Sequence, residues 1–428
     1  MASLLRYKSH QYDLSNVNSL SDLESLTSLE SRKPKDMYMV FGDNGEPWIE
    51  AFQFLINKSH LNSKTILSNA KDLAAYLTFL ELENINWLHF PKRKSERCLY
   101  RFREYLIDPE RVSDTRLTEQ RRINLIISFY KWADHEGYIE KGIEKWVNQN
   151  VSISFYTDFG FKRSMSLSTT DLRISARKSN TGTVEGGLMP LHPKDRDALV
   201  NYLRKSSSAT HQMFLHIFSI GFWSGARSET IRTLGVSNLE KAKKAHPLDK
   251  NIPQLVYLAV GGNTGVKTKY GVQGYLRIPE PVFNELYSYA YSNERVLRGA
   301  KARANGKDED ILFLTKYGNP ISEDSFTALM SELRARLVAD GLTQFHNLKF
   351  HQSRATCGTE LASMMLKDGG TDMDAIGIVR DWLMHKEEST TWMYIKFVHN
   401  YKWTKEFADN FVAQFLGHGF ASGLPTHD

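Results

Sequence analysis

The first strong pattern of hydrophobic and polar positions begins near residue 63. Apolar residues recur there at steps of three and four, which places them on one face of a helix. This stripe consists of Ile66, Ala70, Leu73, Leu77 and Leu80. Ser63 or Asn62 is suited to cap the helix, because a short polar side chain can accept a hydrogen bond from the first turn. The pattern predicts an amphipathic helix.

Two further helices are predicted before residue 140. One is the Arg-rich stretch RKSERCLYRFREYL, and the other follows Ser113 and Thr115. The apolar stripe of the second is Ile123, Ile126, Ile127, Tyr130 and Ala133. Arg121 and Arg122 lie outside this stripe. A solvated helix face is the ordinary role of any one such arginine, but as a set on a compact helical bundle they could face DNA phosphates.

The helical region spans residues 61–160. Such periodicity is absent from the segments next to it, residues 1–60 and 161–187. Residues 1–60 are expected to form an N-terminal arm or accessory segment, in which the stretch SNVNSLSDLESLTSLESRK would be a solvated arm or short helices. Residues 161–187 are rich in Ser, Thr and Gly, which is typical of an interdomain linker. The basic side chains of this stretch could lie along DNA or be merely solvated; they are Lys162, Arg163, Arg173, Arg177 and Lys178.

A second domain is predicted over residues 188–428. It opens with PLHPKDRDALVNYL, where His192 or Pro193 precedes a good first helical turn. One β-rich interruption follows, in which QLVYLAV and YLRIP flank the Gly-rich stretch GGNTGVKTKYGVQG. Such runs on both sides of a turn indicate a hairpin. The chain is therefore expected to be mainly α-helical, with a small β-hairpin in a mixed α/β second domain.

Composition narrows the class of protein. A length of 428 residues exceeds what one hydrophobic core usually organises. The net charge of +6 and a pI near 9.0 favour a polyanionic partner. Cys98 and Cys357 make no metal-ligand spacing or disulfide framework, so a reducing, cytoplasmic setting is expected. With no apolar run near the ~20 residues that span a bilayer and no secretion signal, we expect a mature, soluble chain.

Two sequence constellations place arginines where a buried anion could lie. In GFWSGARSETIRTL, Arg227 shares helical spacing with Ile231 and Leu234, so it is expected on the buried side. In FHQSRATCGTELA, His351 and Arg354 are three residues apart above small residues. A buried guanidinium needs an anionic partner, either a protein carboxylate, which is the commoner case, or a ligand phosphate. A hydrogen-bonded core histidine is likewise the commoner role of a lone His.

A third constellation, DWLMHKEESTTWMYIKF, sets His385 and Tyr394 nine residues apart. On one continuous helix they would face opposite sides. A shared site requires a break, and Ser389 or Thr390 is a good cap for a new helix that carries Tyr394. The ordinary alternative is an aromatic side chain packed in a core with its hydroxyl hydrogen-bonded.

These three pieces, in this order, resemble the tyrosine recombinase, or phage-integrase, family. The family pattern is an Arg after a helix-to-turn Gly, then His-x-x-Arg, a Leu-Gly-His-like motif and a Tyr nine residues later. Here it is matched by Arg227, His351, Arg354, His385 and Tyr394. The resemblance spans roughly residues 188–400, with weaker similarity of residues 63–140 to the family's core-binding, SAM-like domain. Two positions depart from the pattern: Thr230 replaces a common Glu, and Met384 replaces the usual Gly before the last His.

The resemblance implies an activity and a role for each residue. DNA would be cleaved and rejoined through a 3′-phosphotyrosine on Tyr394, without metal, ATP or another cofactor. The two arginines would bind the non-bridging phosphate oxygens, His351 would assist proton transfer, and His385 would hydrogen-bond a phosphate oxygen. The family places a proton-donating lysine on a β-hairpin, and Lys267 is preferred over Lys269 because its Lys-Thr pair follows the first strand.

The resemblance also implies double-stranded DNA as partner, a homotetramer on DNA, possible accessory DNA-binding proteins, and a nucleoid location when bound. A C-terminal helix with Phe407, Phe411 and Phe415 on one face could pack on its own domain or dock into a neighbouring protomer. A type IB topoisomerase-like activity and a catalytically silent DNA-binding protein are the alternative functions. The sequence does not specify the DNA site, the direction of recombination or the mobile element.

Overall fold

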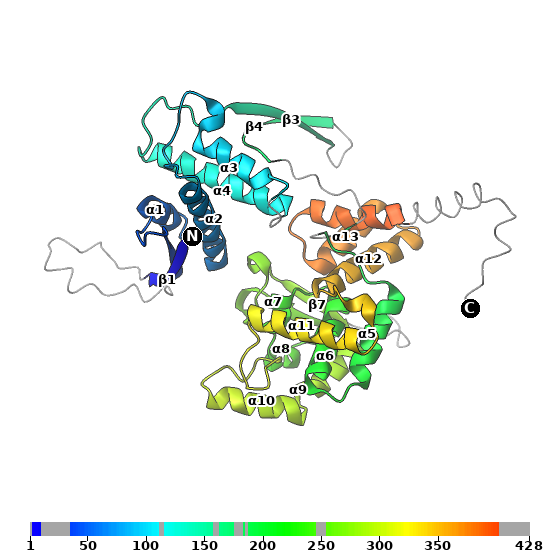
Figure 1. Ribbon diagram of the computed structural model, residues 1–428. Helices are drawn as coiled ribbons and strands as arrows, with labels where there is room; N and C mark the ends of the chain where they lie inside the picture. The colour runs from blue at the N-terminus through cyan, green and yellow to red at the C-terminus, as the bar shows by residue number, and fades with distance from the viewer. Residues whose placement is uncertain are drawn as a thin grey trace, which may run out of the picture. The chain divides into compact units, whose positions relative to one another are not determined.

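The computed structural model describes residues 2–9, 35–110, 115–156, 162–174, 183–184, 187–244 and 254–401. The chain forms two compact units, residues 1–178 and 179–428 (Figure 1). Helices dominate the described residues, and the sheets are small and antiparallel, which confirms the expected mainly α fold class. Within those ranges no helix has both the length and the apolar character needed to cross a membrane.

The first unit has its helices in the middle and a two-stranded hairpin near each end. Its elements are β1 (Ser3–Ser9), β2 (Lys35–Phe41), α1 (Ile49–Asn57), α2 (Ser63–Leu82), the 3₁₀ helix η2 (Lys94–Glu96), α3 (Cys98–Ile107), α4 (Arg116–His135), β3 (Asn148–Tyr156) and β4 (Lys162–Thr170).

Two caps start the long helices of this unit where the sequence predicts. The Asn62 side chain accepts a hydrogen bond from the Lys64 N–H at 2.9 Å, and that of Thr115 accepts one from Thr118 N–H at 3.3 Å. The predicted apolar stripes of α2 and α4 enter one core, because both helices pack against each other and against α3. At its centre the hydroxyls of Tyr76 and Tyr130 lie 2.7 Å apart.

Residues 35–57 of the expected N-terminal arm or accessory segment pack into the first unit, whereas the stretch expected as a solvated arm or short helices, residues 15–33, lies outside the described residues. Val40 on β2 and Trp48, Phe54 and Leu55 on or next to α1 are buried in the core of the first unit. The two elements are short, seven and nine residues, so neither gives a long periodic pattern. Their burial depends on packing against α2, which the local sequence does not reveal.

Part of the predicted linker is also regular structure. β4 pairs with β3 in an antiparallel hairpin, with Val151 opposite Leu167 and Ile153 opposite Met165. Apolar residues alternate with polar ones in both strands, which is the period of a strand rather than of a helix. A search for helical periodicity misses this pattern. The two compact units meet in sequence between Lys178 and Ser179, within the segment predicted to link the domains.

The second unit combines helices with one three-stranded sheet of order β5-β6-β7. Its elements are α5 (Pro193–Lys205), α6 (Ala209–Ser224), α7 (Ser228–Arg232), α8 (Val236–Glu240), β5 (Lys243–Lys244), β6 (Leu255–Val260), η4 (Gly262–Thr264), η5 (Lys269–Gly271), β7 (Gly274–Pro279), α9 (Glu280–Ala290), α10 (Asn293–Ala304), α11 (Glu323–Ala339), η6 (Thr343–Phe345), α12 (His351–Lys367) and α13 (Asp372–Leu383), followed by a helix over residues 388–401.

Two hydrophobic clusters organise this unit. The larger one surrounds α6, which contacts α5, α9, α12 and β7 and is apolar around most of its circumference. The predicted hairpin is present as β6 and β7, and it packs into this cluster. The smaller cluster is formed by α12, α13 and the helix over 388–401 (Figure 1). Phe407, Phe411 and Phe415 lie outside the described residues.

Candidate active site

Arg354, in the first turn of α12, has the largest fully buried side chain in the described part of the chain. Its Nη1 donates to the Gly225 carbonyl at 2.6 Å, and its Nη2 donates to the Leu383 carbonyl at 2.9 Å. Gly225 is the C-cap of α6 and Leu383 ends α13, so the guanidinium meets the negative ends of two helix dipoles. These two acceptors are neutral carbonyl oxygens, so they are not the anionic partner that the sequence predicts for a buried guanidinium.

These two hydrogen bonds join three segments that are far apart in sequence. Arg227 lies two residues after Gly225, and His385 lies two residues after Leu383. His351, the first residue of α12, lies one turn before Arg354 and is half-buried. The structure therefore brings the segments that carry Arg227, His351, Arg354 and His385 to one place in the second unit.

The turn before Arg227 requires glycine at position 225. Gly225 has a left-handed backbone with φ 63°, and a Cβ there would lie 2.2 Å from Cδ2 of Leu383. The sequence prediction that Arg227 shares a helical face with Ile231 and Leu234 is wrong. Arg227 is the extended N-cap of α7, which begins at Ser228, so it is half-buried while Ile231 and Leu234 are fully buried.

A second left-handed turn precedes His385. Met384 is the C-cap of α13 with φ 53° and ψ 50°, a conformation that favours glycine. This explains in physical terms why glycine suits that position of the family pattern. The side chain of Met384 lies close against Gly274 of β7, where an added Cβ would be 2.4 Å from its sulfur. Packing of Met384 on the sheet thus accompanies the strained backbone.

His385 is buried and oriented by the start of the next helix. Its Nδ1 shares a hydrogen bond with the Thr391 hydroxyl at 2.9 Å, and its backbone N–H donates to the Arg380 carbonyl at 2.9 Å. The chain leaves α13 at Leu383 and becomes helical again at residue 388. The predicted helix break is therefore confirmed, although Ser389 and Thr390 lie inside the new helix rather than at its cap.

Tyr394 is fully buried, and its ring stacks on that of His385 with 5.8 Å between centroids and 27° between planes. Gly358 of α12 also lies close to this ring, because an added Cβ there would be 2.5 Å from Cε1 of Tyr394. The small residues of α12 therefore admit the tyrosine ring. In this conformation Tyr394 occupies the position of a packed aromatic, the ordinary alternative foreseen from the sequence.

The two hairpin lysines differ in how their backbone is held. The Lys267 N–H donates to the Thr233 hydroxyl at 2.8 Å, directly after α7, whose N-cap is Arg227. Lys269 lies in η5 at the tip of the hairpin, with Nζ 5.2 Å from the centre of the Tyr270 ring. Both side chains are exposed. Of the two lysines, Lys267 is thus the one whose backbone is held at the end of α7.

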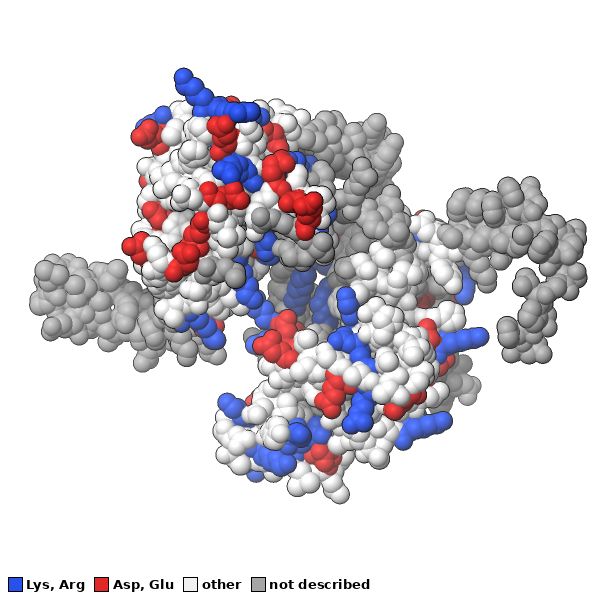
Figure 2. All heavy atoms as spheres, in the orientation of Figure 1, with Lys and Arg blue, Asp and Glu red and all other residues white. Residues whose placement is uncertain are grey.

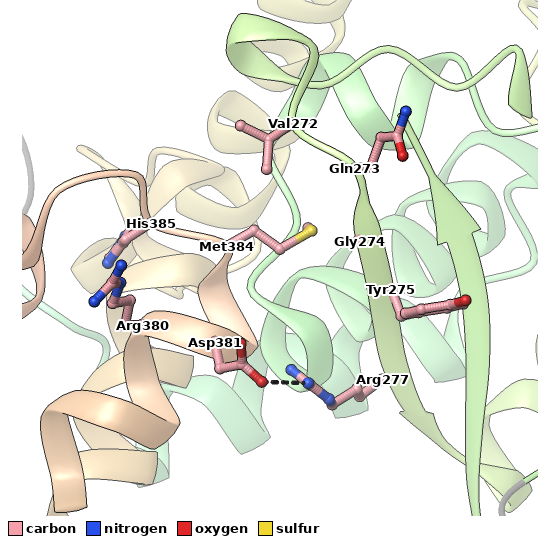
Figure 3. A pocket seen from close by; sticks show the side chains of 9 residues that line it. All are labelled: Val272, Gln273, Gly274, Tyr275, Arg277, Arg380, Asp381, Met384 and His385. Atoms are coloured by element: carbon pink, nitrogen blue, oxygen red, sulfur yellow. Dashed lines mark hydrogen bonds and ion pairs between the residues drawn. The ribbon is translucent and has the colours of Figure 1, made fainter. Parts of the chain in front are cut away.

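A shallow pocket of about 380 Å³ connects the hairpin with the end of α13 (Figure 3). One wall consists of residues 272–275 and Arg277, at and just before the start of β7, and the other is formed by Arg380, Asp381, Met384 and His385. Arg277 pairs with Asp381 across it at 2.9 Å, and its guanidinium lies 5.2 Å from the Trp382 ring. The pocket therefore places His385 on a surface shared with the hairpin.

Sequence reasoning missed several residues of this surface. Arg380 forms an ion pair with Glu388, the first residue of the helix that carries Tyr394. Arg277 and Trp382 hold β7 against α13, and Trp382 Nε1 donates to the Trp223 carbonyl at 2.9 Å. Arg380 and Trp382 do lie within five residues of His385, so proximity to a recognised motif was the signal that could have identified them.

Of the six DNA-binding candidates, only Arg121 and Arg122 have described side chains, and both bind the buried Asp72. Arg121 Nη1 lies 2.8 Å from the Asp72 carboxylate and Arg122 Nε lies 3.4 Å from it. Arg121 is 48% exposed and Arg122 only 18%. On the face of the first unit visible in Figure 2, acidic side chains are interspersed with basic ones. Arg121 thus remains the more accessible candidate for a phosphate.

The other predicted DNA contacts lie in or beyond the second hairpin. Lys162 and Arg163 are in β4, whose backbone pairs with Tyr156 and Phe155 of β3. Arg173 is exposed, and Arg177 and Lys178 lie outside the described residues. These positions stay predictions.

Comparison with known proteins gives similarity in structure but not in sequence. No protein-family model and no curated protein sequence matches the chain. Three similar solved structures are the Tn1549 transposon integrase with circular intermediate DNA (TM-score 0.49, 12% identity, 81% of this chain and 94% of that chain), the XerH site-specific recombinase bound to difH (0.47, 11%, 81% and 81%) and a lambda integrase dimer on a COC′ core site (0.45, 12%, 81% and 94%).

These scores lie below 0.5, so the roles of individual residues have to be argued from the site itself. Two further observations on the described residues concern a cysteine nucleophile and metal binding. Burial raises the pKa of the Cys357 thiol to about 12, which keeps it protonated and unsuited to nucleophilic attack. The described ranges contain no group of three or more His, Cys, Asp or Glu side chains that could hold a metal ion.

Proposed function

We propose that this protein is a tyrosine-type site-specific DNA recombinase, or integrase, with Tyr394 as its nucleophile. The observation that carries the proposal is the pair of hydrogen bonds from Arg354 to the carbonyls of Gly225 and Leu383. They join the segments that carry Arg227, His351, Arg354 and His385, and Tyr394 stacks on His385 with 5.8 Å between ring centroids. A phosphodiester in the middle of such a set would meet charged donors for its oxygens and a phenol for its phosphorus.

The reaction is a phosphoryl transfer, in which one phosphate ester bond forms and another breaks. The Tyr394 hydroxyl loses its proton, with His351 as acceptor, and its oxygen attacks the phosphorus; the bond to the deoxyribose 5′-oxygen breaks. A phenol has an ordinary pKa near ~10, so attack at neutral pH requires this assistance and a polarised phosphate. Arg227 and Arg354 bind the non-bridging oxygens, and His385 donates to one of them.

Departure of the 5′-oxygen requires a proton, and Lys267 supplies it. The reverse reaction, attack by the 5′-hydroxyl of a partner strand on the phosphotyrosine, returns the proton to Lys267 and frees Tyr394. No bond energy is lost, so rejoining needs no nucleotide cofactor. Exchange between two duplexes breaks four strands, and each break occupies one Tyr394. The active assembly is therefore a homotetramer on two double-stranded DNA sites.

Cleavage by this mechanism requires a movement, because Tyr394 and Arg354 are fully buried and His385 is buried as well. The turn over residues 384–387 separates α13 from the tyrosine helix, and the Arg380–Glu388 ion pair lies across it. A DNA phosphate is a competing anion for Arg380. Binding of DNA would thus weaken the ion pair and allow the helix to shift, so that the tyrosine hydroxyl reaches the phosphate.

The decisive experiment is covalent trapping. Duplexes from the DNA that flanks the gene, nicked so that a short fragment is lost after cleavage, are incubated with the full chain and separated under denaturing conditions. A protein–DNA adduct that forms without added metal and maps to Tyr394 is expected. DNA binding without any adduct would leave a silent DNA-binding protein, and relaxation of supercoiled DNA lacking a cognate site would identify a topoisomerase.

The role of Lys267 has a separate chemical test. Lys267→Ala should slow adduct formation by about 100-fold or more, the usual contribution of a general acid. A 5′-bridging phosphorothiolate, whose sulfur leaving group needs no proton, should restore the rate. The comparison variant is Lys269→Ala, which leaves the proton donor in place; the rates are compared at saturating protein, so that a weaker phosphate contact does not affect them. Rescue confined to Lys269→Ala would transfer the role to that residue.

A further inference from the structure

The tetrapeptide Thr-Lys-Tyr-Gly occurs twice in the second unit, at residues 268–271 and 315–318. In both copies the glycine N–H donates to the threonine carbonyl, at 3.1 and 2.9 Å. In both, the lysine Nζ lies over the tyrosine ring, 5.2 and 5.1 Å from its centre. Tyr270 is 77% exposed and Tyr317 is 64% exposed. Residues 315–318 can therefore serve as a control for the properties of residues 268–271.

The two copies differ in the backbone of the tyrosine. Tyr270 has φ 63° and ψ 17°, in the left-handed region, where glycine is strongly preferred at the third position of such a turn. Tyr317 is not among the described residues with positive φ. The same four residues thus fold without strain elsewhere, so the tetrapeptide itself does not impose the strain on Tyr270. Strain of this kind collects at sites of function.

The two copies also differ in their second neighbour. The ring of Tyr270 lies 5.9 Å from the Nζ of Lys386, the residue directly after His385. The contact crosses from the hairpin to the end of α13, as the Arg277–Asp381 ion pair does. The pocket that His385 lines has its walls in the same two segments, between these two contacts (Figure 3). Tyr270 therefore stands at the edge of the candidate active site.

A tyrosine between two ammonium groups is suited to one ligand chemistry in particular. Base stacking on an aromatic ring is favourable for any base, and ammonium groups bind the phosphates on either side. In water a lysine gains little from an exposed ring, so it can exchange that contact for a phosphate. With most of its surface open, the ring has room for a base.

We propose that Tyr270 is a base-stacking residue of the DNA site. Its ring takes an unpaired or unstacked base next to the scissile phosphate, while Lys269 and Lys386 move to the flanking phosphates. The inference rests on the proposed function and adds a positioning contact that couples the hairpin of Lys267 to the turn of His385. A brace without DNA contact, in which Tyr270 only holds Lys386, is the competing outcome.

The test uses the full chain with Tyr394→Phe, so that binding is measured without cleavage. The probe is a short duplex with one bulged 2-aminopurine, whose fluorescence falls when the base stacks. Binding should quench the probe, and Tyr270→Ala should abolish the quenching. It should also weaken binding to the bulged duplex by about 5- to 100-fold relative to a fully paired duplex. Tyr270→Phe should retain both effects.

Tyr317→Ala is the matched control, because it removes the same side chain from the same tetrapeptide, and it should change neither quenching nor affinity. Lys386→Ala should weaken binding in a salt-dependent way but keep the quenching. Unaltered quenching and affinity in Tyr270→Ala would overturn the proposal. Covalent trapping with Tyr394 intact separates the two claims: Tyr270-dependent quenching without an adduct would overturn the recombinase activity alone, and a normal adduct with Tyr270-independent quenching would overturn the stacking role alone.

Discussion

Each unit of the chain buries tyrosine side chains completely, yet their surroundings differ. In the first unit Tyr76 and Tyr130 lie in the middle of long helices, and each hydroxyl is the other's hydrogen-bond partner at 2.7 Å. Cys98 is their further polar neighbour, with its sulfur 3.4 Å from the Tyr130 hydroxyl. In the second unit Tyr394 lies soon after a helix break, stacks on His385, and packs on α12 one turn beyond Arg354.

The difference separates a structural tyrosine from a candidate nucleophile. Burial is the main cause that raises the pKa of both Tyr76 and Tyr130 well above the ordinary phenol value, so they stay protonated. Among the described residues, the groups that act on the two phenols are each other, Cys98 and the Trp87 carbonyl, and none of these is a cation. Tyr394 is buried to the same extent, but its segment adjoins histidine and arginine side chains. Burial alone thus says little about reactivity, and the neighbouring charges decide it.

Replacement of the Tyr394 hydroxyl should have the largest effect and break the comparison most directly. Tyr394→Phe should reduce covalent adduct formation by at least about 1000-fold, or about 4 kcal/mol of activation free energy, because the nucleophile is gone. Its free energy of unfolding should fall by no more than about 1.5 kcal/mol. Gel separation of trapped adducts and urea denaturation measure the two quantities. Substantial adduct formation by the variant would exclude Tyr394 as nucleophile.

The close packing of Tyr394 on α12 can be tested next. Gly358→Ala should lower the free energy of unfolding by about 1–3 kcal/mol, because the new methyl group would overlap the Tyr394 and Leu383 side chains. Gly377→Ala in α13 is the control, since a Cβ there meets nothing within 4 Å and alanine favours a helix by up to about 1 kcal/mol. Equal stability of the two variants would contradict the packing seen here.

The tyrosine pair of the first unit should respond in the opposite sense to Tyr394. Tyr130→Phe should lower the free energy of unfolding by about 1–2 kcal/mol, because the Tyr76 hydroxyl and the Trp87 carbonyl each lose a buried hydrogen-bond partner. Adduct formation by the folded variant should be unchanged within about twofold. A large loss of cleavage at wild-type stability would show that the first unit contributes more than binding and support.

Alkaline pH provides the smallest and most specific test of the comparison. Because the folded-state pKa of Tyr130 lies above its unfolded value near ~10, the stabilisation is complete below pH ~10 and is lost as pH rises above it. Each such tyrosine contributes a slope of at most about 1.4 kcal/mol per pH unit. The decline in unfolding free energy should be shallower in Tyr130→Phe. Parallel curves for the two proteins would argue against a raised pKa.

The sequence predicts elements whose signals are local. The caps Asn62, Thr115 and His192, the apolar stripes of α2 and α4, and the β6–β7 hairpin all follow from residues within one turn or one strand pair. Strands β1 to β5 were missed, because none is longer than nine residues; in β3 and β4 the apolar residues alternate with polar ones. A period of two over so few residues gives a weak signal without knowledge of the partner strand.

The sequence proposes the residues of the candidate site but does not give their geometry. The order and spacing of the histidines, arginines and Tyr394 identify the candidates, and the polar run before Tyr394 predicts the helix break. The burial of Tyr394 depends on its contact with Gly358, which is distant in sequence. The Arg227 face was predicted wrongly because α7 is only five residues long, so helical spacing does not extend back to its N-cap.

The two hydrogen bonds of Arg354 have a consequence for protein engineering. The side chain that would bind phosphate also closes the turns before Arg227 and His385, so no substitution can remove the charge without loosening the scaffold around it. Selection for a new DNA target or for a faster enzyme would therefore not change Arg354. Substitutions that leave the protein folded are expected instead around the site, at the hairpin tip and at the Arg380–Glu388 contact. There each side chain has a single role.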